Sequence, residues 1–357
     1  MRRASCWRPV GRSVRSRRPE PWLENLPIVR SERGVSDTGS LADGEDPATG
    51  LARTHPGWSR RASASRLHLH ESVIPAGDPF ERDPGFVAML AAPMCAVNSY
   101  FATEVRGWER LPAQGPFLVV GNHSGGAETV DLVFFLGPWI ARRGAESPLY
   151  ALGYDLLFDY PIVGRLFPRF GFVPASRANA RRAFAEGAAV IVFPGGDHEV
   201  FRPWSHRNAI DFGGHLGFVE TALECGVPVV PMTIHGAHES TFVLTRGKRL
   251  ARQTGLAAWL HVKVFPFVWS IPFGPVPAFV PSIPLPSKVT VEIGAPLDWT
   301  RYGPDAVRDR AIVQRCYDEI TVQMQATLDR LARETPYPIL DRVTSWLPGR
   351  HARRQHA

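Results

Sequence analysis

The chain has 357 residues, of which 44% are hydrophobic and 21% are charged. This composition is typical of a globular protein and excludes a wholly disordered or fibrous chain. The formal net charge is +7. No DNA-binding motif and no interleaving of basic with aromatic residues accompanies it, so we expect no nucleic-acid partner.

Arginine is concentrated near the amino terminus. Residues 1–75 hold thirteen Arg against eight acidic residues, and the first eighteen residues hold seven Arg and no acid. Apolar periodicity is weak over residues 1–78, where Arg, Ser, Gly and Pro abound, so we expect a basic and mostly disordered tail. Such a tail is attracted to an anionic membrane surface. We expect the folded domain over residues 79–347 and a short basic tail over 348–357.

The four cysteines, Cys6, Cys95, Cys225 and Cys316, lie far apart in the sequence. None of them has the paired spacing that is typical of a zinc site or a redox pair. We therefore expect reduced thiols in a cytoplasmic protein, with Cys225 and Cys316 as small residues of the core.

Two uncharged stretches are candidates for contact with a membrane. Residues 84–103 reach the length of a membrane-spanning helix, but Pro93 and Asn98 interrupt them. We predict a helix that lies on the core or in the lipid interface. Residues 264–287 contain seven prolines. Because proline removes backbone donors and breaks helices, we expect an extended apolar loop there, packed on the core or dipping into lipid.

Strand and helix patterns alternate through the folded part. Short continuous apolar runs, typical of strands buried on both faces, occupy residues 117–120, 188–193, 229–234 and 289–293. Helical patterns occupy residues 131–143, 176–186 and 215–225, and apolar residues at helical spacing predict one long amphipathic helix over 304–334. The alternation predicts an α/β fold with a mostly parallel sheet, covered by helices on both faces.

His123 lies in a glycine-rich segment, residues 121–126, directly after the first apolar run. A histidine that acts as a general base needs one ring nitrogen free to accept a proton and the other held by a carboxylate. Glu128 and Asp131 follow five and eight residues later, and a helix that starts after the glycines brings either acid toward the ring. A lone histidine in a tight turn is often satisfied by backbone alone, but two nearby acids favour chemistry.

A second polar cluster follows the apolar run at residues 188–193. Gly195 and Gly196 leave backbone N–H groups unobstructed, which suits an oxyanion or a phosphate. Arg177 precedes this turn and Arg202 follows it, and arginine binds phosphate bidentately. The simpler interpretation is a strand-ending turn with surface arginines. Polar groups at the carboxyl ends of strands gather at one edge of a sheet, so we expect a site shared with His123.

A third and weaker pair, His235 and His238, follows the apolar run at residues 229–234. Histidines in loops are often merely polar. We therefore treat contact of these two side chains with a substrate as the less favoured interpretation.

Four sequence blocks, in their order and spacing, resemble the glycerolipid acyltransferase superfamily. The resemblance is strongest to the branch that contains monoacylglycerol and diacylglycerol acyltransferase-like proteins. The blocks are residues 121–126 with an acid behind them, 171–177, 193–202 and 226–231. Together they cover much of residues 85–300 and imply a fold like that of the glycerol-phosphate acyltransferases.

The resemblance also implies roles for single residues. His123 is implied to be the base that activates the acceptor hydroxyl. In the superfamily an acid follows five residues after this histidine, where the chain has Glu128. Asp131 lies three residues further, and we favour it narrowly because the two extra glycines absorb the displacement. Arg177 is implied to bind the phosphate or headgroup of the acceptor. The pocket is completed by Gly195, Gly196, Glu199 and Arg202.

These features predict an O-acyltransferase that moves a fatty acyl group to the hydroxyl of a glycerolipid or lysolipid acceptor. The donor is expected to be acyl-CoA or an acyl-carrier-protein thioester, with no cofactor and no metal. We expect the protein on the cytoplasmic side of a membrane, peripheral or shallowly embedded.

Three alternatives stay open. One is a lipid-binding or membrane-surface protein without catalysis. A second is a metal-dependent hydrolase with ligands His123, Glu128, His198 and Glu199, although no pair of histidines has the helical spacing that is typical of zinc hydrolases. A third makes Ser124 a nucleophile, without the usual nucleophile-elbow pattern.

Overall fold

The computed structural model describes residues 80–123, 131–154, 158, 163–247, 266–270, 274–278 and 283–347. The tails expected over residues 1–78 and 348–357 lie outside these residues, and they stay predictions.

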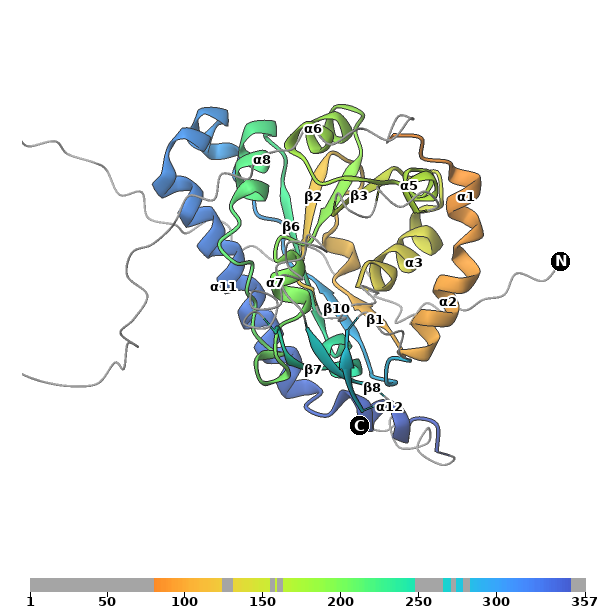
Figure 1. Ribbon diagram of the computed structural model, residues 1–357. Helices are drawn as coiled ribbons and strands as arrows, with labels where there is room; N and C mark the ends of the chain where they lie inside the picture. The colour runs from red at the N-terminus through yellow and green to blue at the C-terminus, as the bar shows by residue number, and fades with distance from the viewer. Residues whose placement is uncertain are drawn as a thin grey trace, which may run out of the picture. The chain divides into compact units, whose positions relative to one another are not determined.

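A seven-stranded sheet forms the centre of the fold (Figure 1), in the order β1-β10-β6-β2-β5-β3-β4. The five neighbouring strands from β6 to β4 run parallel, whereas β10 runs antiparallel to β6 and parallel to β1. All five residues of β2 are buried, as expected of a strand covered on both faces. The strands are β1 Glu104–Arg106, β2 Phe117–Gly121, β3 Leu149–Gly153, β4 Phe172–Pro174, β5 Ala189–Val192, β6 Val229–His235 and β10 Thr290–Ile293.

The predicted α/β class with a mostly parallel sheet is confirmed. The four predicted strands correspond to β2, β5, β6 and β10. The sequence patterns did not predict β1, β3 and β4 of this sheet. β1 and β4 have only three residues each, which is too few for a periodic pattern. The antiparallel direction of β10 was also missed, because an apolar run does not encode from which end the chain enters the sheet.

Helices cover both faces of this sheet, as predicted (Figure 1). Phe117 and Val119 face the layer of α1, α2 and α3. Leu118 and Val120 face the layer of α6, α8 and α11, because successive side chains of a strand point to opposite faces. The α-helices are α1 Pro84–Met89, α2 Ala91–Tyr100, α3 Asp131–Arg143, α5 Val163–Leu166, α6 Arg177–Ala185, α7 Gly196–Val200, α8 Gly217–Cys225, α11 Arg310–Glu334 and α12 Pro338–Thr344.

Local sequence signals mark the start of α6 and the end of α8 close to the predicted positions. Ser176 Oγ accepts a hydrogen bond from Asn179 N at 3.1 Å at the start of α6. Gly226 follows α8 with a φ of +59°, a left-handed conformation that favours glycine. α3 covers the predicted residues and continues through Pro138.

The long carboxyl-terminal helix begins later than predicted. Pro304–Arg308 forms a 3-10 helix, and α11 starts at Arg310, after Asp309 accepts a hydrogen bond from Ala311 N at 2.8 Å. The apolar pattern extended further because Ala306 of the 3-10 helix is also buried. The amphipathic face itself is confirmed by the buried residues of α11, which are Val313, Cys316, Ile320, Met324, Leu328 and Leu331.

The uncharged stretch over residues 84–103 forms α1 and α2, joined at Leu90. Met94 and Asn98 are buried, and Asn98 Nδ2 donates to Val133 O of α3 at 3.0 Å, so one face of α2 packs on the core. Among the described residues, none of the helices combines the length and apolar character that crossing a membrane requires. Contact of the outer face with lipid stays a prediction.

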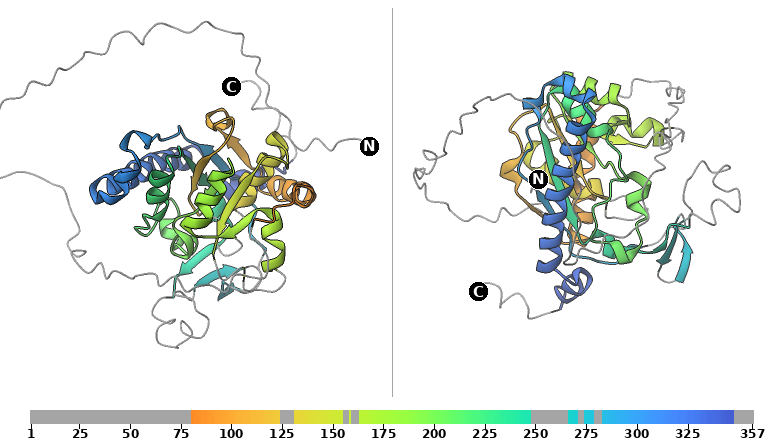
Figure 2. Two further views of the ribbon diagram at one scale, coloured as in Figure 1. Left: turned by 90° about the horizontal axis from the view of Figure 1, so that it is seen from above. Right: turned by 90° about the vertical axis from the view of Figure 1, so that its left-hand side faces the viewer.

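The proline-rich stretch over residues 264–287 contains two strands, so the prediction of a loop is wrong for them. They are β8 Phe267–Ser270 and β9 Gly274–Pro277, and they form an antiparallel sheet in the order β7-β8-β9 with β7 Phe242–Thr245. Figure 2 shows this small sheet apart from the main one. Pro275 and Pro277 are accommodated because β9 is an edge strand, where a missing N–H leaves no partner unpaired.

Two of the cysteines are free thiols within the described residues. Cys316 is buried and Cys225 is partly buried, as predicted. Cys95 of α2 is disulfide-bonded, so the expectation of reduced thiols is wrong for this residue. Spacing along the chain does not show which cysteines meet in the fold.

Candidate active site

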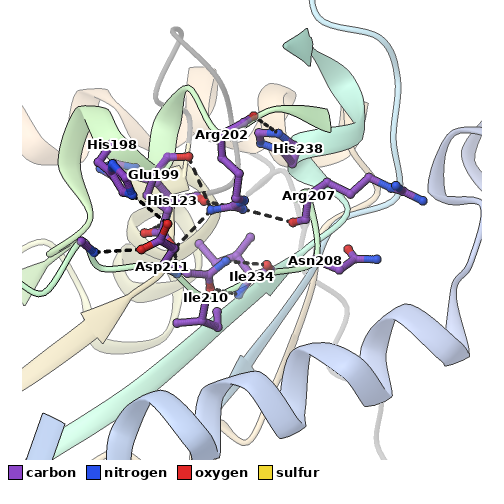
Figure 3. A network of polar contacts seen from close by, with 12 residues as sticks. His123, His198, Glu199, Arg202, Arg207, Asn208, Ile210, Asp211, Ile234 and His238 are labelled. Carbon is purple, nitrogen blue, oxygen red and sulfur yellow. Dashed lines mark hydrogen bonds and ion pairs between the residues drawn. The ribbon is translucent and has the colours of Figure 1, made fainter. Parts of the chain in front are cut away.

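Three polar segments meet at the carboxyl ends of β2, β5 and β6 (Figure 3). His123 lies two residues beyond β2, the turn 194–196 follows β5, and His235 ends β6. These strands are parallel neighbours, so their carboxyl ends share one edge of the sheet, where open α/β sheets place their sites. The structure thus brings the first two predicted clusters together.

Close packing and an amide side chain fix the backbone before His123. A Cβ atom on Gly121 would lie 2.6 Å from a ring carbon of Phe193, so only glycine fits there. Asn122 is fully buried, and its side chain donates to Ile234 O at 3.0 Å and accepts from Ile234 N at 2.7 Å. Asn122 therefore joins the end of β2 to β6 beyond the last main-chain pair.

His123 forms a pair with Asp131, the first residue of α3. His123 Nδ1 lies 3.0 Å from Asp131 Oδ2, and the Asp131 side chain is only 1% exposed. An ionised carboxylate only accepts hydrogen bonds, so beside one a neutral imidazole carries its proton on Nδ1 and leaves Nε2 as the accepting nitrogen. The rival acid, Glu128, and the alternative nucleophile, Ser124, lie outside the described residues.

The His123 ring is also held by an aromatic side chain. The Phe193 ring stacks on it with centroids 4.6 Å apart and planes inclined by 22°. The His123 side chain keeps 14% of its surface exposed. Within the described part of the chain, Nε2 has no hydrogen-bond partner. Asp131 and Phe193 thus orient the ring and leave Nε2 available to a substrate.

A buried ion pair holds the peptide groups on both sides of the His123 Cα atom. Arg202 Nη1 lies 3.2 Å from Glu199 Oε1, and both side chains are almost fully buried. Glu199 Oε2 accepts a hydrogen bond from His123 N at 2.9 Å, and Arg202 Nη2 donates to His123 O at 3.2 Å. Burial raises the pKa of the Glu199 carboxyl to about 7, against the opposing effect of the Arg202 charge.

This arrangement differs from the predicted role of Glu199 and Arg202. The sequence predicted that both line the acceptor pocket, but their side chains are 0% and 1% exposed. Arg202 Nη2 also donates to Arg207 O at 3.1 Å, whereas Arg202 Nε is buried without a hydrogen-bond partner among the described residues. A sequence pattern does not reveal that two charged groups are buried against one another. In the structure they position His123.

Gly195 and Gly196 have different roles in the turn after β5. A Cβ atom on Gly195 would lie 2.5 Å from Glu199 Oε2, so glycine leaves room for this carboxylate. Gly196 has a φ of +49°, and its N–H donates to Phe193 O at 3.3 Å. The Gly196 amide is therefore used inside the turn, whereas the sequence predicted free amides that bind an oxyanion or phosphate.

Arg177 does not join the His123 site in the structure. It is the first residue of α6, and its guanidinium forms ion pairs with Glu220 and with Glu224 of α8, the latter at 3.3 Å. The predicted binding of an acceptor phosphate by Arg177 would require the loss of these pairs.

The other histidines near the site have separate partners. His198 Nε2 lies 2.7 Å from Asp211 Oδ2. His238 Nε2 donates to Arg202 O at 2.9 Å. Burial lowers the pKa of His235 to about 4 and that of His238 to about 3, so both are neutral core groups. No group of three or more His, Cys, Asp or Glu side chains that could hold a metal ion occurs among the described residues.

The sequence patterns assigned no role to Asn122, Phe193 or Asp211. One signal was available for Phe193. β2 and β5 pair in parallel with Val120 opposite Val192, so the next residues, Gly121 and Phe193, lie side by side, and a glycine beside an aromatic residue indicates close packing. Asp211 has no such signal, because its segment follows no period and meets His198 only through the fold.

A family model described as Acyltransferase matches residues 102–235. An uncharacterized protein of Mycobacterium tuberculosis (strain ATCC 25618 / H37Rv) is 31% identical over 256 residues, which cover 71% of this chain and 69% of that protein. The "DGAT1/2-independent enzyme synthesizing storage lipids" of Bos taurus is 26% identical over 53% of this chain and 54% of that protein. "Phytyl ester synthase 2, chloroplastic" of Arabidopsis thaliana is 26% identical over 57% of this chain and 30% of that protein.

Proposed function

Because this chain belongs to the glycerolipid acyltransferase family, we propose that it transfers a fatty acyl group from a thioester to a lipid hydroxyl, with His123 as general base. The contact of His123 Nδ1 with Asp131 Oδ2 at 3.0 Å carries this proposal. A buried carboxylate on one ring nitrogen fixes the tautomer. It also stabilises the imidazolium that forms when the other nitrogen takes a proton.

The acceptor oxygen attacks the carbonyl carbon of the thioester while His123 Nε2 removes the hydroxyl proton. The new C–O bond gives a tetrahedral intermediate whose negative charge lies on the former carbonyl oxygen. When this intermediate collapses, the C–S bond breaks and the proton on His123 passes to the leaving thiolate. The products are an ester and a free thiol, so atoms and charges balance without a covalent intermediate on the enzyme.

The Glu199–Arg202 pair supports this proposal as a positioning device. A catalytic group contributes most when its geometry is set before the substrate binds, because later ordering adds to the barrier. Glu199 and Arg202 bind the two peptide groups of His123, while Asp131 and Phe193 bind its ring. Backbone and ring of His123 are thus held independently.

For the acceptor we propose a lipid alcohol without a phosphate next to the reacting hydroxyl. The guanidinium groups of Arg177 and Arg202 are both paired with carboxylates of the protein, so neither stands free to bind a phosphate. The printed names of the bovine and Arabidopsis relatives refer to storage lipids and phytyl esters, which fits acceptors of this kind. We propose acyl-CoA as the donor, with an acyl-carrier-protein thioester as the alternative.

Substitution of the base tests the proposal. With labelled acyl-CoA and a panel of monoacylglycerol, diacylglycerol, lysophospholipid and long-chain alcohol acceptors, the wild-type protein is expected to form one class of ester. His123→Ala is expected to lower its turnover by about 10²- to 10⁴-fold, the usual contribution of a general base. His206→Ala, an equal change at an exposed histidine, is the matched control. Near-normal turnover of His123→Ala would assign the base to another group.

A further inference from the structure

One end of the fold carries apolar side chains that face solvent. Ile283, Leu340, Val343, Trp346 and Leu347 are between 39% and 78% exposed, and we name this set the terminal apolar surface. Four of them lie on α12 and the turn behind it, and Ile283 precedes β10 in the chain. Scattered exposed apolar residues are normal, but a contiguous group marks an interaction surface.

Contacts around Tyr100, the last residue of α2, bring these segments together. The Tyr100 hydroxyl donates to Pro284 O, next to Ile283, at 2.7 Å. The ring centroids of Tyr100 and Trp346 are 6.5 Å apart. Lys288 N donates to Pro338 O at the start of α12 at 2.9 Å. The two parts of the terminal apolar surface are therefore neighbours in space.

α12 is oriented with its apolar side outward. Arg342 donates to Tyr100 O at 2.6 Å and to Ser99 O at 2.7 Å, and these bonds hold one side of the helix against α2. Leu340 and Val343 of α12 are three residues apart, so they share a face of the helix, and Trp346 and Leu347 follow in the turn behind it. A surface helix of a soluble protein normally turns such a face toward the core. Here it meets solvent.

The terminal apolar surface lies at the same end of the sheet as His123. Gly236 directly follows β6, and a Cβ atom there would lie 3.5 Å from Pro338 Cβ of α12. β6 and β2 run parallel, so the carboxyl end of β6 and the His123 turn belong to one edge. Figure 1 shows α12 at the same lower end of the fold as β7 and β8.

We infer that the terminal apolar surface docks this protein on an anionic phospholipid bilayer. Within α12 the charges of Asp341 and Arg342 balance, so the excess positive charge lies in the residues that follow in the sequence. Arg342 stacks over Trp346 at 4.7 Å, and residues 348–357 add three Arg and two His without an acid. Basic residues close to an anionic leaflet each add favourable binding energy, and tryptophan favours the interface. A second copy of this chain would bring the same positive charge to the contact, which disfavours self-association there.

The inference rests on the proposed function only for the reason why this surface lies near His123. Binding of the surface to a bilayer does not depend on acyl transfer. A lipid acceptor is held in a bilayer, and docking through α12 brings the His123 edge of the sheet to the lipid. Vesicle binding is measured without an acyl donor, so it succeeds or fails independently of acyl transfer. His123→Ala is expected to bind vesicles as tightly as the wild-type protein does.

Vesicle co-sedimentation of the full chain tests the inference. The probes are vesicles of phosphatidylcholine alone and of phosphatidylcholine with an equal part of phosphatidylglycerol. The triple variant Ile283→Ser, Leu340→Ser, Leu347→Ser removes exposed apolar groups and is expected to bind the anionic vesicles at least about tenfold more weakly. The control is Val322→Ser on α11, which removes an exposed apolar side chain outside the terminal apolar surface. It is expected to bind like the wild-type protein.

Two further measurements make the result decisive. Binding of the wild-type protein is expected to be stronger with phosphatidylglycerol and to weaken as salt is raised, because screening reduces the attraction between charges. Unchanged vesicle binding of a folded triple variant, judged by circular dichroism, would overturn the inference. A wild-type dimer that the triple variant loses in sedimentation, without any change in vesicle binding, would assign the surface to self-association instead.

Discussion

At the scale of residues, the site depends on which side chains share a hydrogen bond. In the sequence two acids, Glu128 and Asp131, follow His123 closely, and the structure pairs its ring with Asp131 and its peptide N–H with Glu199. These two contacts differ in kind. The first contact holds the ring of His123, and the second holds its backbone. We therefore expect a change at Asp131 to act on the proposed chemical step and a change at Glu199 to act on the position of His123.

The partner of His123 is tested by two matched substitutions. Asp131→Asn keeps the size of the side chain but no longer selects the tautomer with a basic Nε2, so kcat is expected to fall by about 10²-fold or more with little change in KM. Glu128→Gln is expected to keep kcat within a few-fold of wild type. The measurement is steady-state acyl transfer at saturating donor. A larger effect of Glu128→Gln than of Asp131→Asn would reverse the assignment.

At the scale of elements, the site is built by the ends of β2, β5 and α3. β2 and β5 lie side by side, so the residues just beyond them touch, and α3 starts with Asp131 against the turn that follows β2. Position 121 shows how tightly these ends are joined. Its backbone passes the Phe193 ring so closely that a Cβ atom would lie within 2.6 Å of a ring carbon. The packing that orients the ring of His123 thus depends on glycine, which has no Cβ atom, at position 121 of β2.

Gly121→Ala tests this packing. The added methyl group forces Phe193 away from the His123 ring, so the free energy of unfolding is expected to fall by about 1–3 kcal/mol, as in other overpacked cores. Turnover is expected to fall as well. Gly217→Ala at the start of α8 is the control, because nothing lies within 4 Å of the added atom and alanine favours helix. Urea unfolding measures both variants, and equal stability of the two would contradict the packing argument.

At the scale of the whole molecule, buried neutral histidines make the free energy of unfolding depend on pH. His235 and His238 are 3% and 2% exposed, and burial lowers the pKa of their side chains to about 4 and about 3. In the unfolded chain both titrate near a pKa of about 6.5. As the pH falls below that value, the unfolded state takes up protons that the folded state does not bind. Their contribution to stability is complete above pH 6.5 and decreases toward pH 4.

Acid unfolding tests this linkage. Each histidine is expected to lower the free energy of unfolding by about 1 kcal/mol per pH unit as the pH falls from about 6.5 to 4. His238→Gln keeps a donor for Arg202 O but does not titrate, so its stability is expected to fall less steeply over this range. His206→Gln at an exposed position is the control. The free energy of unfolding is measured by urea unfolding at several pH values. If it changes with pH equally in the wild type and in His238→Gln, His238 does not contribute to the acid sensitivity.

The sequence by itself determined the features that depend on local pattern. Continuous apolar runs predicted β2, β5, β6 and β10, because a strand buried on both faces requires apolar side chains throughout. Ser176 and Gly226 marked helix ends, because capping and a left-handed turn need particular residues. His123 stood out because a glycine-rich turn with acids behind it follows a buried strand.

Only the tertiary structure decided how these parts meet. Glu199 lies 76 residues from His123 and Ile234 lies 112 residues from Asn122, yet both pairs share hydrogen bonds. No local pattern encodes such contacts, because they depend on which strands become neighbours and on which charges the packed helices bury. For the same reason, the sequence could narrow the partner of His123 to two acids but could not place Asp131 against its ring. That contact exists because α3 begins at the edge where β2 ends.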